Sequence, residues 1–461
     1  MHFSTWFWKK SRENSTPFMH TADTTSATPT PCSNKHLLAA LAVATQSLSL
    51  LAEEDISDED GHVLIAKGHQ LTAELLERLT RRRLDRPPET CIRVEHGVTA
   101  VDLEHAMVTM CQKSSILALT VGGEFSRLRR IFREMPLSPF ALLMLSVQRR
   151  VRPESFFHAL LASIVAGTLA LRNERSGLDP LSAVLAGLLH DVGEMYLNPQ
   201  NLVHVSDVDS ARWMEISKHP EIGMQLIREC TGCPEDVARA VCEHHEMLDG
   251  SGFPRGLSGD AISPLGQLLS LVETVCRTAQ AHDNQGARVR LAVSFVAGEF
   301  PPQLVHSLLA PIKGTLVAEV SLPTSFDMTS ALERARSISQ CLTDASAHLE
   351  HDVLSAVSTE HTRAVVDFAR EHVHKLQLSW EATGIGTYFS GDLPKTSSAE
   401  EYELAYHDLD VASHELKWRM RRLSRTLAAM SHSLPPPLPG VLVAVISALE
   451  VRSRSRGQAT T

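Results

Sequence analysis

The pattern of hydrophobic and polar positions predicts helices over most of the chain. In LSAVLAGLLHDVG the apolar side chains fall three or four residues apart, which is the spacing of one buried helix face. This helix ends at His190 and Asp191, so a titratable pair follows directly on a buried element. Strand-like alternation is confined to residues before about 100. We therefore expect a mainly α fold.

The same pattern divides the chain into four parts. Residues 1–35 are rich in Ser, Thr and Pro and are expected to be disordered, because they offer little apolar surface to bury. Residues 36–100 predict a small α+β domain, whose size suits a regulatory role. Residues 101–313 predict an all-helical domain. Residues 314–461 predict a helical C-terminal region of unknown role.

Within the small domain, HLLAALAVATQSLSLLA at 36–52 predicts a buried helix that leads into a strand. A turn at DEDG precedes the strand HVLIAKG, because glycine and aspartate favour turns. Thr72 is a suitable N-cap for the helix that follows, and TCIRV predicts the last strand. These elements together predict a compact unit of helices and short strands.

The segment EEYELAYHDLDVASHELKWRMRRLSRTLAAM carries two seams of residues at heptad spacing: Leu409, Leu416, Leu423 and Met430, and Tyr406, Ser413, Met420 and Leu427. Such a repeat is typical of a coiled coil, so one interpretation is a homodimer through residues 402–430. The alternative is a helix packed inside its own chain. The basic residues near its end suit the helix dipole: Arg419, Arg421, Arg422 and Arg425.

Composition narrows the class of partner and the compartment. The formal net charge of -10 argues against nucleic acid or an anionic membrane as the principal partner. No apolar run reaches the roughly 20 residues that span a bilayer, and no secretory signal is evident. The eight cysteines show no disulfide framework. We therefore expect a cytoplasmic protein that binds neither nucleic acid nor membrane.

Five histidines and three carboxylates lie on or beside the apolar helices between 154 and 273. Each of them alone is more often a hydrogen-bonded core or surface residue than a metal ligand. Together they favour a metal centre, because a buried charge needs a partner or an ion. The candidate ligands are Glu154, His158, His190, Asp191, His219, His244, His245 and Glu273.

The order of these motifs, with DGSGFP after the double histidine, resembles the HD-GYP family of metal-dependent phosphohydrolases. The resemblance runs from about Leu142 to Leu309. It implies an all-α HD-type domain with two or three divalent ions, commonly iron or manganese. It also implies hydrolysis of the bacterial second messenger cyclic di-GMP to pGpG or GMP. Glu154 and His158 match the extra pair of members with a third ion, and the other six candidates match or stand at the positions of family ligands.

The turn after the double histidine is the expected substrate-binding segment: Asp249, Gly250, Gly252, Phe253 and Pro254. Its glycines allow the backbone to approach a bulky nucleotide closely, and Phe253 offers an aromatic face to a base. Phe253 stands where the family has Tyr, so a hydroxyl group is lost while stacking is retained.

Two further departures concern the catalytic centre, where the resemblance places Asp191 and position 194. The family motif HDxGK is HDVGE here, so Glu194 replaces a lysine that attracts the substrate phosphate, and Glu273 replaces Asp. Two alternatives therefore stand beside a cyclic di-GMP phosphodiesterase. One is a degenerate module that binds cyclic di-GMP or docks a diguanylate cyclase (GGDEF) partner. The other is a metal phosphohydrolase that acts on another nucleotide.

Overall fold

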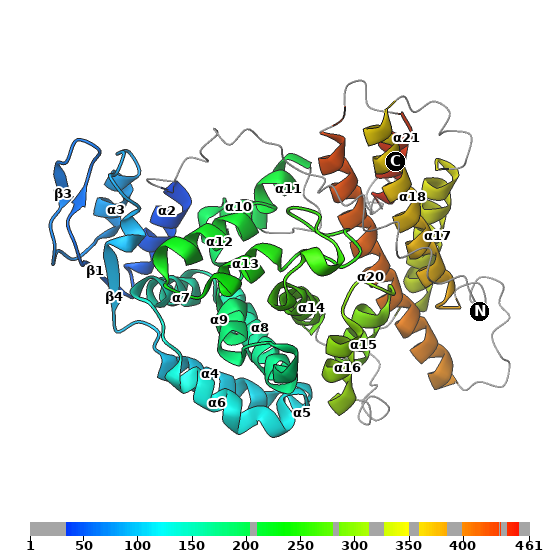
Figure 1. Ribbon diagram of the computed structural model, residues 1–461, viewed down its shortest axis with the longest axis horizontal. Coiled ribbons are helices and arrows are strands. Elements are labelled where there is room, and N and C mark those ends of the chain that lie inside the picture. The colour runs from blue at the N-terminus through cyan, green and yellow to red at the C-terminus, as the bar shows by residue number, and fades with distance from the viewer. Residues whose placement is uncertain are drawn as a thin grey trace, which may run out of the picture.

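A computed structural model describes residues 34–202, 210–279, 285–312, 327–349, 359–384, 399–432, 434 and 440–450. Residues 1–33, most of the segment expected to be disordered, lie outside this range. The fold is mainly α, as predicted. Figure 1 shows an N-terminal unit (blue), a central group of helices (cyan to green) and a C-terminal bundle (yellow to red) that follow one another along the long axis.

The N-terminal unit contains two helices and two short antiparallel strand pairs. Its elements are α2 Lys35–Ala44, β1 Ser49–Ala52, β2 Ile56–Ser57, β3 Val63–Ile65, α3 Ala73–Leu79 and β4 Ile92–Glu95. β1 pairs with β4, and β2 pairs with β3. The Thr72 hydroxyl accepts a hydrogen bond from the Leu75 amide and so caps α3, as predicted. Gly61 closes the DEDG turn with a φ of 80°, which glycine adopts without strain.

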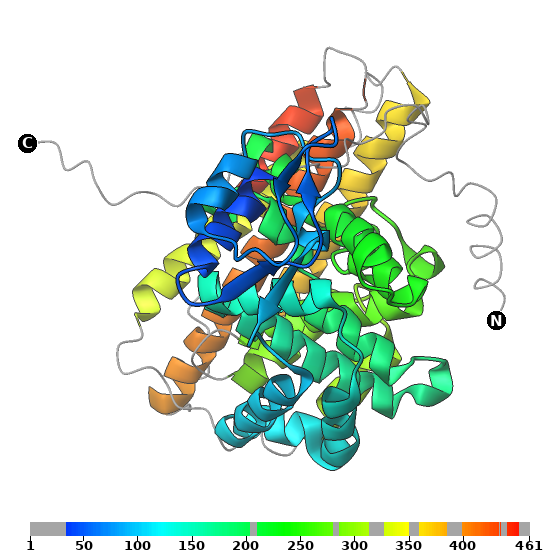
Figure 2. The same cartoon turned by 90° about the vertical axis from the view of Figure 1, so that its left-hand side faces the viewer.

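The core of the N-terminal unit is shared with the central helices. Leu41, Leu50 and Leu76 are buried together with Phe140 and Leu143 of α7 (Pro139–Val151). Tyr196 of the short 3-10 helix η4 (Val192–Tyr196) joins the same cluster and donates a hydrogen bond to the carboxylate of Glu89. Figure 2 views the molecule from this side. The N-terminal unit therefore packs directly against the segment that follows His190-Asp191.

The central group holds the helices that carry the candidate ligands. Besides α7 and η4 it comprises α4 Ala100–Lys113, α5 Ser115–Val121, α6 Phe125–Glu134, α8 Pro153–Arg172, α9 Pro180–Leu189, α10 Pro199–Leu202, α11 Ser210–Ile216, α12 His219–Cys230, α13 Glu235–Glu243, α14 Pro264–Ala279, α15 Gln285–Ser294 and α16 Pro302–Leu309. α8 packs against α7, α9 and α14. It is long and apolar enough to cross a membrane, but 72% of its apolar window is buried inside the protein, which is typical of a core helix.

The C-terminal bundle consists of α17 Met328–Ala347, α18 Glu360–Glu381, α20 Ala399–Ser431 and α21 Gly440–Leu449. Both seams of α20 contribute to the core of this bundle, where Leu416, Met420 and Leu427 are fully buried against α17, α18 and α21. The heptad spacing thus reflects a helix packed inside its own chain, which is the alternative to a coiled-coil homodimer.

Candidate metal centre

The ends of three helices bring histidines to one point in the central group. His190 is the C-cap of α9, His219 is the first residue of α12, and His244 is the C-cap of α13. His158 of α8 and Glu273 of α14 approach from two longer helices. The predicted helices are present, and their packing brings together residues that are up to 115 positions apart.

The ligand atoms form two neighbouring groups. In one, His158, His190 and Glu273 have their atoms within 4.8 Å of one another. The other comprises Asp191, His219, His244 and His245 at the same limit. Seven of the eight predicted ligands therefore converge. Glu154 belongs to neither group, and it is exposed in the first turn of α8.

Asp191 lies between the two groups and faces both. Its Oδ2 is 3.0 Å from Nε2 of His190 and 3.7 Å from Nε2 of His158. Its Oδ1 is 3.4 Å from Nε2 of His219 and 3.5 Å from Nε2 of His244. One carboxylate with an oxygen toward each group is suited to hold two cations at a short separation.

Backbone carbonyl groups orient three of the imidazole rings. The Nδ1 atoms of His190, His219 and His244 lie 2.8, 2.8 and 2.6 Å from the carbonyl oxygens three residues earlier in the chain. Because a carbonyl oxygen only accepts, each Nδ1 carries a proton, and in its neutral form each ring directs the Nε2 lone pair into the site. This outer hydrogen bond is the usual support of a metal-ligating histidine.

Two pairs of Nε2 atoms lie unusually close together. The distance is 3.1 Å between His158 and His190 and 3.2 Å between His219 and His244. Facing lone pairs repel each other, whereas neighbouring donors around one transition ion, at about 2.1 Å from it, lie roughly 3 Å apart. The histidine and carboxylate donors therefore fit divalent transition ions.

The charges of the site shift its pKa values in opposite directions. Burial lowers the pKa of His190, but the negative charges of Asp191 and Glu273 outweigh it and raise that pKa well above the ordinary value. Burial lowers the pKa of His245 well below its usual range, and His244 and His219 add to this effect. Burial raises the pKa of Glu273, yet His158 and His190 bring it well below the usual value. These opposed shifts are typical of a functional site.

Glutamate at 273 reaches the site despite its extra methylene group. Its Oε2 lies 2.9 Å from Nε2 of His158 and 3.6 Å from Nε2 of His190. The extra methylene group is what distinguishes Glu273 from the aspartate of the family pattern, and it could have moved the carboxylate away from the site. The packing of α14 against α8 and α9 instead places the carboxylate beside both histidines.

Two glycines are required by close backbone packing around the histidines. A Cβ on Gly193 would lie 2.1 Å from the carbonyl oxygen of His219, and one on Gly252 would lie 2.4 Å from that of His245. The turn after the double histidine thus folds back on the backbone of its own chain, where Phe253 donates from its amide to His245. The glycines of this turn were expected to allow a close approach to a nucleotide. At Gly252 the backbone instead closely approaches the backbone of His245, a candidate metal ligand.

The aromatic ring of Phe253 covers His245, one of the candidate ligands. Its ring stacks on His245 with 4.4 Å between the ring centres and an interplanar angle of 20°. Trp213 of α11 contacts Phe253 edge-on, with ring centres 4.9 Å apart. One face of Phe253 is therefore occupied by His245, and Trp213 is an aromatic neighbour of the site that no sequence motif indicated.

Glu194 does not present an isolated negative charge. Arg152, at the junction of α7 and α8, places its guanidinium Nη2 3.2 Å from Oε2 of Glu194, and both side chains are only 19% exposed. Burial and the negative charge of Asp191 raise the pKa of Glu194, while His219 and Arg152 oppose that shift. Our expectation of an unbalanced charge reversal at HDVGE overlooked Arg152, because the two residues are 42 positions apart in sequence.

The basic residues of α20 also differ from expectation. Arg419 and Arg422 do not simply complement a helix dipole, since both are buried and both contact the carboxylate of Glu299. Their spacing of three in an otherwise amphipathic helix is the one sequence signal for an inward-facing pair.

The sequence of the central helices matches a known class of domain. Residues 139–295 match the family model of the HD domain. The match confirms the resemblance of this segment to the HD domain.

Several curated proteins are similar to part of this chain. A cyclic di-GMP phosphodiesterase of Pseudomonas aeruginosa is 28% identical over 38% of this chain and 43% of its own length. The 3'3'-cGAMP-specific phosphodiesterase 3 of Vibrio cholerae is 30% identical over 25% of this chain and 24% of its own. The chain thus spans less than half the length of these relatives. A solved HDG"Y"P protein from Bdellovibrio bacteriovorus is 18% identical over 58% of this chain and 94% of its own, with a TM-score of 0.27, too low to compare the folds.

Proposed function

We propose that this protein is a metal-dependent phosphodiesterase that hydrolyses cyclic di-GMP in bacterial signalling. The observation that carries the proposal is the position of Asp191 between two groups of histidine and carboxylate donors. The similarity to proteins named as cyclic di-GMP phosphodiesterases supports the substrate class.

Two ions are the number that the two groups of donors can hold. His158, His190 and Glu273 would hold one, and His219, His244 and His245 the other, with Asp191 shared. Iron or manganese suits such a mixture of imidazole and carboxylate ligands. Bound ions would supply Lewis-acid activation of water and of a phosphate oxygen. A third ion would need Glu154, which is exposed on α8.

The surrounding residues orient the ligands and the substrate. The carbonyl groups of Gly187, Ile216 and Val241 hold the three imidazole rings in one orientation. We assign the Asp249–Pro254 turn, with Phe253, to nucleotide binding, and Asp191 and Glu194 to the catalytic centre. Glu194 acts there together with Arg152, so that the pair presents no net charge to an anionic ligand.

Metal analysis joined to a turnover assay tests the proposal. Protein purified without air is expected to carry at least two transition ions per chain and to convert cyclic di-GMP to pGpG or GMP. Less than one ion per chain after addition of iron or manganese, with no turnover, would leave only a binding module that senses cyclic di-GMP.

A second candidate substrate has a specific observation in its favour. Three of the similar proteins are named 3'3'-cGAMP-specific phosphodiesterases. This dinucleotide has the same cyclic phosphodiester backbone and differs in one base, so the choice depends on the residues that contact the bases. Parallel assays with the two dinucleotides at equal concentration decide between them.

The remaining expectations concern the setting of the enzyme. We propose a cytoplasmic location. The regions 36–100, 101–313 and 314–461 stay our proposed division of the chain. A diguanylate cyclase (GGDEF) partner also stays a prediction. A homodimer through residues 402–430 has little support, since the apolar seams of α20 are buried in the C-terminal bundle.

A further inference from the structure

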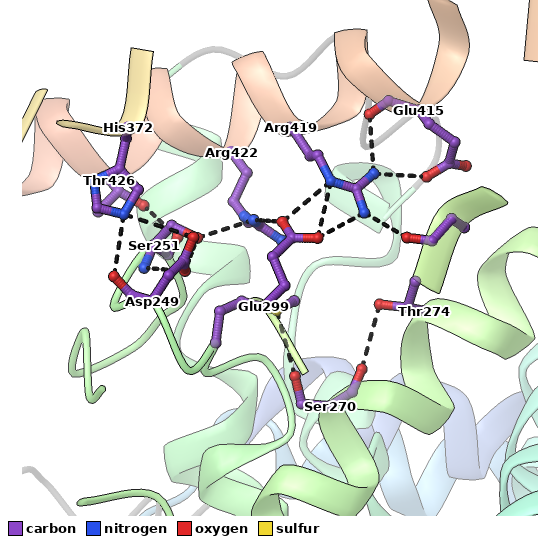
Figure 3. Close-up of polar contacts among 12 residues, drawn as sticks. Asp249, Ser251, Ser270, Thr274, Glu299, His372, Glu415, Arg419, Arg422 and Thr426 are labelled. Atoms are coloured by element: carbon purple, nitrogen blue, oxygen red, sulfur yellow. Dashed lines mark hydrogen bonds and ion pairs between the residues drawn. The ribbon is translucent and has the colours of Figure 1, made fainter. Parts of the chain in front are cut away.

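Two helices of the C-terminal bundle contact the turn that carries Phe253. Thr426 of α20 donates from its hydroxyl group to the carbonyl oxygen of Ser251 at 3.1 Å, and Arg422 donates from Nη2 to the Ser251 hydroxyl at 2.9 Å. His372 of α18 places Nε2 3.1 Å from the carbonyl oxygen of Asp249. Figure 3 shows these three side chains pointing from α20 and α18 toward the turn. All three lie outside the segment that matches the HD domain.

A buried ion cluster fixes α20 at this place. Arg419 donates from Nη2 and Nε to the carboxylate of Glu299 at 2.7 to 3.1 Å, and both side chains are only 1% exposed. Arg422 donates from Nη2 to Oε1 of the same carboxylate at 2.5 Å. The backbone carbonyl of Glu299 accepts from the amide of Leu248, the residue before the turn. Glu299 thus binds α20 through its side chain and the start of the turn through its backbone.

Local hydrogen bonds give the turn part of its shape. The Asp249 carboxylate accepts hydrogen bonds from the Ser251 amide and hydroxyl, which shapes the turn locally. Gly250 has a φ of 81°, and Gly252 supplies no side chain to anchor the segment. A glycine-rich turn has many conformations in the absence of outside contacts. The contacts from α18 and α20 therefore add a restraint to those that the turn makes with its own part of the chain.

Two residues of this turn, Ser251 and Phe253, connect α20 with the candidate metal centre. Ser251 is held by Arg422, and Phe253, two residues on, stacks on His245. A second route runs from Arg425 of α20, whose guanidinium lies 4.2 Å over the ring of Trp213, to the edge of Phe253. α20 therefore contacts both Ser251, two residues before Phe253, and Trp213, which touches the ring of Phe253.

We propose that Arg422 is a positioning residue of the site. The C-terminal bundle holds the Asp249–Phe253 turn in the conformation that binds a nucleotide. The role in nucleotide binding rests on the proposed function, whereas the restraint on the turn does not. Arg422 is suited to this role because one guanidinium group binds both Glu299 and Ser251. The bundle thereby becomes part of the functional unit of the HD domain.

The test measures the turn directly, by hydrogen exchange of the amides between 248 and 253 in the full chain. Arg422→Gln removes the charge that binds Glu299 and the donor to Ser251. Thr426→Val removes one hydroxyl group without a change of shape. We expect exchange in this segment to accelerate about tenfold in Arg422→Gln and less in Thr426→Val, since each lost hydrogen bond lowers the cost of local opening. Metal content should stay unchanged.

Arg334→Gln is the matched control, because Arg334 of α17 pairs with Asp410 of α20 and does not touch the turn. Its exchange between 248 and 253 should equal that of the wild type. With cyclic di-GMP, KM should rise about tenfold in Arg422→Gln while kcat changes less. The substitution loosens the turn proposed to bind the nucleotide but leaves the candidate metal ligands in place. If Arg422→Gln fails to fold, Thr426→Val decides alone.

Wild-type exchange of the turn in both variants would overturn the restraint. Faster exchange with unchanged KM would overturn the role in nucleotide binding. A wild type that neither binds nor cleaves cyclic di-GMP would overturn the proposed function and leave the exchange result standing.

Discussion

Asp191 is the residue on which both groups of donors depend, because each of its oxygens faces a different pair of histidines. Asp191→Asn keeps the shape of the side chain but removes its charge. We expect the variant to lose most of its bound metal and its turnover, while circular dichroism shows unchanged helix content. Asp260→Asn, at an exposed position, is the control and should behave as wild type. Full metal content in Asp191→Asn would contradict the shared-ligand assignment.

The charge of Glu194 is balanced by Arg152, so its removal leaves a free cation near the site. Glu194→Gln should tighten the binding of cyclic di-GMP about fivefold, which corresponds to about 1 kcal/mol for a partly screened charge. Added salt should reduce the gain. Glu174→Gln, which disrupts an exposed pair with Arg127, serves as the control. Loss of metal in Glu194→Gln would instead mean that Glu194 is itself a ligand.

The contact between η4 and α12 depends on the absence of a side chain at Gly193. In Gly193→Ala the new Cβ would lie 2.1 Å from a backbone oxygen of His219, so one of the two elements must move. We expect a loss of about 3 kcal/mol or more in the free energy of unfolding, together with weaker metal binding. Gly123→Ala, where a Cβ meets nothing within 4 Å, should change stability little. Chemical denaturation of both variants measures the difference.

The contact between α14 and α20 should depend on pH through Glu415. Burial raises the pKa of this carboxyl, but Arg277 and Arg419 outweigh it and lower the pKa below its usual value. A folded-state pKa below the unfolded one gives stability that is present above about pH 4.5 and is lost as the pH falls through the lowered value. Glu415→Gln should therefore be less stable than wild type at pH 7, by about 2 kcal/mol or more, and the gap should narrow below pH 4.5.

Denaturation at several pH values checks this narrowing. Glu371→Gln is the control, since Glu371 forms an exposed pair with Lys375 within α18, and such pairs contribute little. A gap between Glu415→Gln and wild type that stays constant from pH 7 to pH 4 would show that the carboxylate of Glu415 is not the group that responds.

Divalent ions bound at the candidate metal centre should stabilise the whole molecule against unfolding. Three helix ends converge on the donors, so bound ions restrain α9, α12 and α13 together. A ligand at a hundred times its Kd adds about 2.7 kcal/mol to the stability of the form that binds it. We expect manganese to raise the Tm of chelator-treated protein by several degrees, and Asp191→Asn to show no rise. An equal rise in both proteins would indicate binding elsewhere.

The sequence by itself determined the mainly α fold, the positions of the principal helices and seven donors that converge in space. It could do so because helix periodicity and caps are local signals, and because several histidines and carboxylates on neighbouring apolar helices together favour a metal centre. Thr72, the end of α9 at His190 and the start of α12 at His219 were all readable in this way.

Only the tertiary structure decided which residues of different helices are in contact. It placed Arg152 against Glu194, buried the seams of α20 inside the chain, and set Arg422 against the turn that carries Phe253. These contacts join residues 42 to 171 positions apart, and no periodicity or motif specifies such pairs. The physical reason is that a helix pattern fixes which face is buried, whereas the partner of that face depends on how all the elements pack at once.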